Sequence, residues 1–362
     1  GTYAAVGGLA SASAGAGVHV DVSMLECMAV TLGGFGGLFA DFWGFLEAAR
    51  SFDGPVRSLE VPSIVPTADG LVGFCTVTAQ QFEDFLLMIE QPDLRGDPRF
   101  ATAPKRMEHE AEFTELVLRW TTRHTTAEIL ELTEAFRIPT APVGTPATIA
   151  DFEQLVDRGV YVTNPGGGFV QPRPPYLVPG APPRPFSPAP ALGEHTGQAA
   201  WPEREPRRTA TRPADRPLDG IRIVDLTAFW AGPAATQVLA SLGADVIKVE
   251  GLARPDGMRL NSTRPPSEDG WWEWGPIFHA VNTNKRGVTL DLGTERGLAL
   301  TMDLIATADV VIENFSPRVL DSFGITWDAV HERAPRCVMV RMPGFGLTGP
   351  WRDRTGFAQT ME

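Results

Sequence analysis

Cysteine is scarce in this 362-residue chain, and long apolar runs are missing altogether. The three cysteines, Cys27, Cys75 and Cys337, are far apart and form no C-x-x-C pair. A disulfide framework, a zinc site and a redox motif are therefore excluded, and we expect reduced thiols in a cytoplasmic protein. No segment approaches the ~18 uninterrupted apolar residues of a membrane span, so we expect no membrane partner.

Positive charge is also in short supply. With 31 Lys and Arg against 44 Asp and Glu, the net charge is -13, which repels phosphate backbones. Nucleic acid is therefore not an expected partner, and an anionic ligand would need a local basic pocket. The chain opens "GTYAAVGGLASASAG", without an initiator Met, a basic segment or a cleavage site, so we expect a fragment rather than a signal peptide or a natural start.

Residues 201–217, "WPEREPRRTATRPADRP", contain five arginines, four prolines and scarcely an apolar side chain. Proline at this spacing prevents a continuous helix and favours extended backbone. A nucleic-acid strip is the weaker alternative, because acidic residues dilute the charge and no aromatic residues alternate with the arginines. The pattern predicts a linker, and the length of the chain agrees with two domains.

The half after the linker alternates short β-branched runs with helical patterns. Strands are predicted at 221–225, 245–249, 287–292, 309–314 and 336–342, with helices at 233–242 and 294–306 and a short one after Pro317. This alternation predicts a parallel, doubly wound, Rossmann-like α/β domain over residues 218–362. Such sheets bind ligands at the carboxyl ends of their strands.

The segments at these strand ends lack the usual nucleotide fingerprints. "AFWAGPAA" contains no G-x-G-x-x-G and places Phe229 and Trp230 where a pyrophosphate needs bare backbone, so NAD and FAD are not expected. No Walker sequence or metal-ligand pattern is present. Basic residues do gather nearby and favour an anionic, phosphate-bearing ligand: Lys248, Arg254, Arg259, Lys285, Arg286 and Arg318. The structural alternative is that Lys248 pairs with a neighbouring acid and the exposed arginines are only solvated.

The half before the linker follows a different pattern. A small-residue helix occupies 1–17, an alternating strand is predicted at 18–24, and a long apolar helix follows at 25–50. A hairpin at Asp69-Gly70, an amphipathic helix and two charged helices near 108–136 then predict a smaller α+β domain.

Four ordered motifs after the linker resemble one known family: "PLDGIRIVDLT", "NTNKRGVTLDL", "ADVVIENFSPRVLDSFGI" and "GFGLTGP". They are similar to the amino-terminal large domain of class III (CaiB/BaiF-type) coenzyme A transferases. Before the linker, "VDVSMLE", "TADG", "DPRF", "IPTAPV" and "LGEHT" resemble the carboxyl-terminal half of the same family. The chain therefore resembles the end of one transferase copy joined to the start of a second.

The resemblance implies a division of the chain into five parts. Residues 1–55 would be helices and a strand from the end of a first large domain, 56–145 a small α+β domain, and 146–200 a segment returning to the large domain. Residues 201–217 would be the linker and 218–362 the CoA-binding large domain of the second copy. Family members are interlocked dimers, so we expect an interlocked dimer or an intramolecular pseudo-dimer.

The resemblance also implies chemistry. CoA would be a substrate, with no permanently bound cofactor, and the partners would be an acyl-CoA and an organic acid. An aspartate would carry anhydride and thioester intermediates, and it is expected just before Gly1 and beyond Glu362, so this segment alone would be inactive. The residues expected to bind CoA are Phe229, Trp230, Arg254, Arg259, Lys285, Asn314 and Phe315. Some relatives carry Arg where this chain has Gly251, and Arg254 or Arg259 would substitute for it.

Other interpretations compete with a transferase. An α-methylacyl-CoA racemase needs an acid and a base, but Phe357 stands where an imidazole is expected; the protein could also be a non-catalytic CoA-binding half. His195 favours a structural role because no partner for it is evident, and "NPGGG" (164–168) favours a plain loop. The segment "RSLEVPS" (57–63) lacks the glycine run that some transferases place over the active site. None of the remaining acids is expected to act as the nucleophile: Asp21 is predicted in a strand and Asp69 in a turn, and Asp225 and Glu250, at strand ends, are expected to cap or pair.

Overall fold

A five-stranded parallel sheet forms the centre of the second half. The computed structural model describes residues 1–15, 17–33, 61–181, 184–198, 200 and 215–361. The strands are β6 (Arg222–Asp225), β7 (Asp245–Glu250), β8 (Arg286–Thr289), β9 (Val310–Glu313) and β10 (Val338–Arg341), in the order β10-β9-β6-β7-β8. All four pairings are parallel. The predicted doubly wound, Rossmann-like fold class is therefore confirmed, because the first strand lies at the centre and the order reverses beside it.

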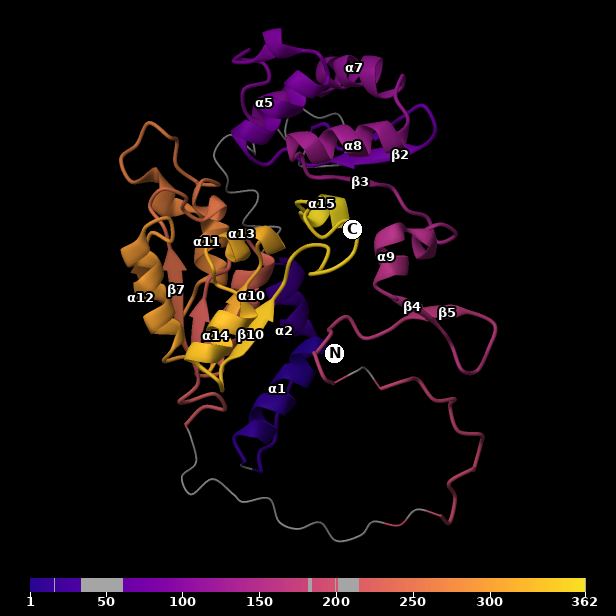
Figure 1. Cartoon of the computed structure of the whole chain (residues 1–362), viewed down its shortest axis with the longest axis vertical. Coiled ribbons are helices and arrows are strands. Elements are labelled where there is room, and N and C mark those ends of the chain that lie inside the picture. The colour runs from indigo at the N-terminus through magenta and orange to yellow at the C-terminus, as the bar shows by residue number, and fades with distance from the viewer. Residues whose placement is uncertain (16, 34–60, 182–183, 199, 201–214, 362) are drawn as a thin grey trace.

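Helices cover both faces of this sheet (Figure 1). On one face, α10 (Ala231–Ser241) packs its Ala240 with Ile223 and Val246. On the other face, Ile305, Leu320 and Val330 form a cluster with Val224 and Val311. These three residues belong to α12 (Glu295–Ile305), α13 (Pro317–Ser322) and α14 (Trp327–Arg333). Burial on both faces explains why the central strands β6, β7 and β9 are continuous β-branched runs rather than alternating ones, whereas the edge strands β8 and β10 are partly exposed.

The connection between β7 and β8 is the longest in the sheet and runs over its carboxyl edge. It contains two 3₁₀ turns, η4 (Gly257–Arg259) and η5 (Trp271–Trp274), and the helix α11 (Pro276–Val281). Met258, Ile277 and Val281 are buried together and form a small core of their own. This connection therefore covers one side of the carboxyl edge of the sheet.

A small antiparallel sheet with its own helices precedes the linker. The strands β1 (Ile64–Pro66), β2 (Leu71–Phe74) and β3 (Thr140–Pro142) pair in chain order. Four phenylalanines at its core are almost or completely buried: Phe74, Phe85, Phe100 and Phe113. They lie among the helices α5 (Ala79–Met88), η2 (Pro92–Leu94), α6 (Ala103–Glu108), α7 (Glu110–Thr121) and α8 (Thr126–Phe136). The predicted α+β character of this region is confirmed.

The predicted Asp69-Gly70 hairpin connects β1 to β2 and also holds α8. The Asp69 carboxylate accepts hydrogen bonds from the backbone N–H and the hydroxyl of Thr126, at 2.7 and 2.9 Å. These bonds hold the pKa of Asp69 below its ordinary value of 3.8. The hairpin acid therefore fixes the start of α8, as the structural role expected for it requires.

One predicted strand is wrong. The small-residue helix forms as α1 (Thr2–Ser13), but residues 17–23 adopt no regular structure before α2 (Met24–Met28) and the π-turn η1 (Ala29–Gly33). Val18 and Val20 alternate with polar residues, yet they are 59% and 40% exposed. An alternating segment forms a strand only where a neighbouring strand pairs with it and a core covers its apolar face. The described residues supply neither here. The predicted helix at 25–50 lies mostly outside the described residues.

Residues 146–181 follow the small antiparallel sheet in the chain. They contain η3 (Ile149–Asp151), α9 (Glu153–Asp157) and the hairpin of β4 (Tyr161–Thr163) with β5 (Val170–Pro172). The "NPGGG" sequence is the turn of this hairpin, as the plain-loop interpretation expected. At the end of the chain, α15 (Ala358–Met361) lies between the large sheet and β3 (Figure 1). Among the described residues, no helix is both long and apolar enough to span a bilayer.

Candidate functional site

The strand order of the sheet reverses between β6 and β9. These two strands are neighbours, but the helices that follow them, α10 and α13, pack on opposite faces. Loops that diverge in this way leave a crevice at the strand ends, where open α/β sheets bind their ligands. The carboxyl ends of the strands point toward the small unit (Figure 1).

Asn314 joins the loops that follow β6 and β9. Its side-chain oxygen accepts a hydrogen bond from the Ala228 N–H at 2.8 Å, and its side-chain nitrogen donates to the Ala228 carbonyl at 2.9 Å. A Cβ at Gly232 would lie 2.5 Å from Thr227 and 3.0 Å from the Asn314 amide, so only glycine permits this close approach. Asn314 thus fixes the loop after β6.

Lys285 and Asp225 form a buried ion pair beneath the first turns of α10. The ammonium group donates to Asp225 Oδ2 at 2.9 Å, to the Pro233 carbonyl at 2.9 Å and to Asn282 Oδ1 at 2.8 Å. The two side chains are 2% and 0% exposed. All three ammonium hydrogens therefore have protein partners, and Lys285 has a structural role at this edge.

The ionisation of this pair follows from burial and mutual attraction. Burial lowers the pKa of Lys285 from 10.5 to about 8, although Asp225 opposes the shift. Burial also works against ionisation of Asp225, but the charges of Lys285 and Lys248 hold its pKa below 3.8. Thr227 and Thr236 donate further hydrogen bonds to the same carboxylate. The acid expected to pair at this strand end does so.

Lys248 and Asp256 form a second buried pair. The Lys248 ammonium donates to the Thr227 carbonyl at 2.8 Å and to Asp256 Oδ2 at 3.0 Å. Asp256 Oδ1 accepts the backbone N–H groups of Phe229 and Met258, each at 3.0 Å. Phe229 has φ +67°, which is uncommon outside glycine, and the bond to Asp256 holds this conformation. The interpretation of Lys248 as paired with a neighbouring acid is borne out.

The two arginines of the 251–259 segment differ in their surroundings. The Arg259 guanidinium binds Glu250 at 2.7 Å and Glu273 at 2.8 Å, and it lies 3.8 Å from the centre of the Phe278 ring. Arg254 is exposed and has no polar side-chain partner among the described residues. Of these two expected phosphate contacts, only Arg254 has its guanidinium free in the described part of the chain.

The three aromatic residues predicted at the site are half-buried. Phe229 and Trp230 pack against the small core around Ile277, and Phe315 packs against the cluster that contains Leu320. The Phe229 ring also meets Phe357 edge-on, with 5.1 Å between ring centres. Phe357 therefore serves as a packing residue against Phe229.

A third buried pair was not predicted. Glu313, at the end of β9, accepts hydrogen bonds from Arg341 of β10 at 2.7 Å and from the Phe315 N–H at 2.8 Å. Glu313 is completely buried, and burial raises its pKa in spite of the Arg341 charge. A sequence signal for this pair was available, because Glu313 and Arg341 lie at the ends of two runs that were predicted as strands.

The loop after β10 is held by α9 from the other half of the chain. The side-chain nitrogen of Gln154 donates to the carbonyls of Phe345 and Thr348 at 2.6 and 2.8 Å, and its oxygen accepts the Trp351 N–H at 2.8 Å. Gly349, with φ +92°, would place a Cβ 2.4 Å from Gln154 Oε1. The "GFGLTGP" motif therefore needs its glycines to make room for this contact.

The remaining candidates lie away from this edge. His195 is in an exposed turn, and Asp21 is exposed in the irregular segment before α2. Residues 57–60 of "RSLEVPS" lie outside the described residues. Cys75 and Cys337 are buried and Cys27 is half-buried, and none of the three forms a disulfide. In the described part of the chain, no three His, Cys, Asp or Glu residues gather as a metal site would require.

Sequence comparison agrees with this architecture. The sequence model of CoA-transferase family III matches residues 1–196 and 218–362, which together are nearly the whole chain. The chain belongs to CoA-transferase family III. The half of the chain after residue 217 has the mixed α/β fold with a parallel five-stranded sheet described above.

Several relatives match less than half of this chain. The succinyl-CoA–D-citramalate CoA-transferase of Chloroflexus aurantiacus is 42% identical over 148 residues, which are 41% of this chain and 35% of the relative. The formyl-CoA:oxalate CoA-transferase of Rhodopseudomonas palustris is 43% identical over 136 residues, or 38% of this chain and 31% of the relative.

Another relative matches both halves. The probable CoA-transferase Rv1866 of Mycobacterium tuberculosis is 27% identical over 347 residues, which are 95% of this chain and 43% of the relative. The chain thus spans less than half the length of these curated relatives. A solved structure of a CAIB/BAIF family protein from Brucella suis is 40% identical, with a TM-score of 0.37, over 41% of this chain and 38% of its own.

Proposed function

We propose that the protein containing this chain moves CoA between an acyl-CoA and a carboxylic acid. The observation that carries the proposal is the two-part family match over residues 1–196 and 218–362. The names of two relatives include D-citramalate and oxalate, which are small dicarboxylic acids, and this supports an organic acid as the acceptor.

The proposed chemistry uses an enzyme aspartate as a covalent catalyst. Its carboxylate attacks the thioester carbonyl of the acyl-CoA, the CoA thiolate leaves, and an acyl-aspartyl anhydride forms. The thiolate then attacks the aspartyl carbonyl, which releases the donor acid and leaves CoA on the enzyme as a thioester. The acceptor carboxylate and the thiolate repeat these two steps in reverse, so that a new acyl-CoA and a free aspartate result.

The reacting aspartate is proposed to lie before Gly1 in one copy and beyond Glu362 in the next. Burial supports this assignment, because the acids at the carboxyl edge already have partners. Asp225 and Glu313 are both completely buried and paired with Lys285 and Arg341. An acid with these contacts has no face open to a thioester carbonyl.

This chain would bind and orient CoA at the carboxyl edge of the sheet. We propose Arg254 for a phosphate, and Phe229, Trp230 and Phe315 for contacts with the adenine and the pantetheine. The buried contacts of Lys285, Asn314 and Arg259 support an indirect role for these three, in which they hold the loops rigid before CoA arrives.

The five-part division and the tandem arrangement belong to the same proposal. They are supported by the Rv1866 match, which runs through both halves in this order and covers less than half of that relative. Residues 201–217 would then join two copies and raise the effective concentration of each for the other, in an intramolecular pseudo-dimer or an interlocked dimer.

Trapping of the intermediate tests the proposed function. The complete protein is incubated with an acyl-CoA and hydroxylamine, and peptides are mapped by mass spectrometry. We expect an aspartyl hydroxamate that depends on the acyl-CoA, with no hydroxamate when the acyl-CoA is omitted. Absence of any modified aspartate would favour a CoA-binding scaffold, and turnover by residues 1–362 alone would contradict the location of the nucleophile.

A further inference from the structure

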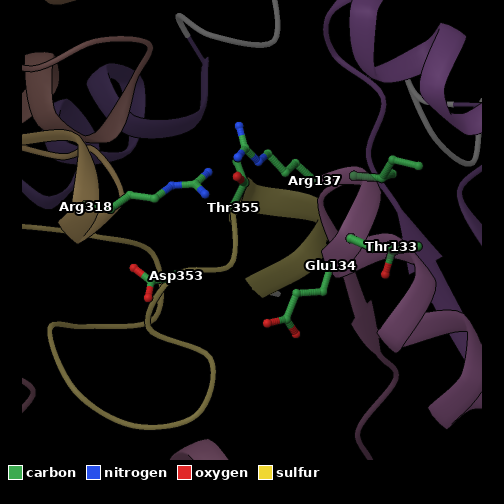
Figure 2. A pocket seen from close by; sticks show the side chains of 8 residues that line it. Thr133, Glu134, Arg137, Arg318, Asp353 and Thr355 are labelled. Carbon is green, nitrogen blue, oxygen red and sulfur yellow. The ribbon is translucent and has the colours of Figure 1, made fainter. Parts of the chain in front are cut away.

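A cavity of about 300 Å³ lies between the two halves of the chain. One wall comes from the end of α8, with Glu134, Arg137 and Ile138, and the other from Arg318 of α13 together with Asp353 and Thr355. Figure 2 shows the guanidinium groups of Arg137 and Arg318 approaching Thr355 from opposite sides. The cavity is therefore built jointly by residues from both sides of the linker.

The acidic residues that line this cavity are paired with bases, whereas its two arginines have no acidic partner among the described residues. Glu134 is bound by Arg354 at 3.2 Å, and Asp353 lies 3.5 Å from Arg352, so each lining acid has a base from outside the lining. Arg137 and Arg318 are exposed and have no ion-pair or side-chain hydrogen-bond partner among the described residues. The two arginines are thus the uncompensated charges, in a protein whose net charge is -13.

Arg137 occupies a position that glycine would fill more easily. It ends α8 with φ +57°, in the left-handed region, and its N–H bonds to the Glu134 carbonyl at 3.1 Å. A residue with a Cβ costs about 1 kcal/mol in this conformation. The helix end therefore fixes the Arg137 backbone and directs a long cationic side chain into the cavity (Figure 2).

We propose that Arg137 and Arg318 bind a carboxylate of the acid substrate, and that this substrate is a small dicarboxylate. Each guanidinium offers paired N–H donors that match the two oxygens of a carboxylate. A carboxylate held in this way is stabilised as an anion and is a poor nucleophile, so it is the carboxylate that does not react. The substrate then needs a second carboxylate to accept CoA.

This inference rests on the proposed function for the identity of the ligand, but the site itself is tested by binding. Isothermal titration calorimetry with succinate uses the 362-residue chain and the variants Arg137→Gln and Arg318→Gln. We expect each variant to bind succinate about tenfold more weakly, because each loses a charge-assisted contact. The matched control is Arg336→Gln, an exposed arginine before β10 without a side-chain partner among the described residues, and it should bind as the unaltered chain does.

Two further ligands distinguish a carboxylate site from a phosphate site and from a site that does not depend on charge. Succinamide has the same length without the charge and should not bind. Inorganic phosphate should bind more weakly than succinate; tighter phosphate binding would assign the arginines to a phosphate instead and overturn the proposal. Arg137→Gly relieves the left-handed conformation, so it should lose succinate binding without a loss of thermal stability, which a purely structural role of Arg137 does not predict.

A transfer assay on the complete protein distinguishes this inference from the proposed function. If CoA transfer occurs and the KM for the acid is unchanged in both arginine variants, the inference is wrong and the function stands. If succinate binding depends on the arginines but no acyl-CoA of the acid forms, the function is wrong and the carboxylate site stands. Unchanged succinate binding by both variants would also overturn the inference.

Discussion

Replacing Lys285 with Met tests whether the carboxyl edge is held by its buried ion pairs. Methionine keeps much of the side-chain length, but it removes the donor of three hydrogen bonds and leaves Asp225, which is 0% exposed, without its closest counter-charge. Breaking a buried pair from one side costs about 3–5 kcal/mol. We expect a loss of this size in local stability, measured by hydrogen exchange of β6 and β7 peptides in increasing urea.

A double substitution separates the lost charge pair from lost packing. Adding Asp225→Asn to Lys285→Met removes the unpaired carboxylate. The amide oxygen can still accept the two Thr227 hydrogen bonds that Oδ1 accepts, and the Thr236 hydroxyl, which donates to Oδ2, also lies 3.1 Å from the Pro233 carbonyl. The double variant should therefore be less destabilised than the sum of the single ones, by more than about 1 kcal/mol. Strict additivity would show that the two residues act independently.

The pH dependence gives a second signature. In the unaltered protein the pKa of Asp225 lies below 3.8, so its contribution to stability is present above that pH and is lost as the pH falls further. Without Lys285, Asp225 loses the strongest of the attractions that lower its pKa, so we expect the pKa of Asp225 to rise in the variant. The folded variant then takes up a proton more readily than the folded unaltered protein, so the cost of the substitution should be smaller at about pH 5 than at about pH 7.5.

The control is Arg286→Met, at the adjacent position. Arg286 pairs with Asp245 on the surface and is 62% exposed, so its loss should cost less than about 1 kcal/mol. Equal effects of the two substitutions, or a cost for Lys285→Met below about 1 kcal/mol, would refute the argument that Lys285 holds the edge. Lys285 would then again be available as a direct ligand contact.

Three smaller predictions concern the contacts between elements. Gly349→Ala should cost about 2 kcal/mol more than Gly324→Ala, because both positions have positive φ but only Gly349 faces Gln154, and hydrogen exchange in each loop compares them. Gln154→Ala should cost about 2–4 kcal/mol, seen as faster exchange in residues 345–351, and unchanged exchange there would contradict the contact. The bonds from Thr126 lower the pKa of Asp69, so the hairpin contact should persist above 3.8 and be lost only as the pH falls below it, as an NMR titration of the carboxyl group would show.

The central strands β6, β7 and β9 were predictable because each contains a buried β-branched run bounded by helical patterns, and the partly exposed edge strands β8 and β10 continue the same alternation of strand and helix. The helix α14 was missed, although Thr326 caps it by accepting the Ala329 N–H, and a threonine before a short amphipathic run was the available signal. The strand at 18–24 was predicted from alternation alone. A pattern of period two shows that two faces differ, but it does not show that a partner strand exists.

The types and positions of residues in the sequence predicted which side chains lie at the carboxyl edge of the sheet, but they did not predict which groups those side chains contact. Lys285 lies 60 positions from Asp225, and Asn314 lies 86 positions from Ala228. Strand order brings these partners together, and nothing local in the sequence encodes the pairing. A lysine at the edge of a sheet therefore has the same pattern whether it binds a ligand phosphate or a buried acid.

The ion pairs at the carboxyl edge of the sheet decide where an anionic ligand can be bound. Lys248, Lys285 and Arg341 are each neutralised by an acid of the same edge, so they supply rigidity rather than attraction for a ligand. The attraction for an anionic ligand must therefore come from arginines outside these pairs. Arg137 and Arg318 belong to different halves of the chain, so the site that they form requires both halves to be in place. Gln154 holds the loop that leads to Thr355, between these arginines, so Gln154→Ala should weaken succinate binding although Gln154 lies outside the cavity. Unchanged affinity in that variant would mean that the two arginines are positioned by α8 and α13 alone.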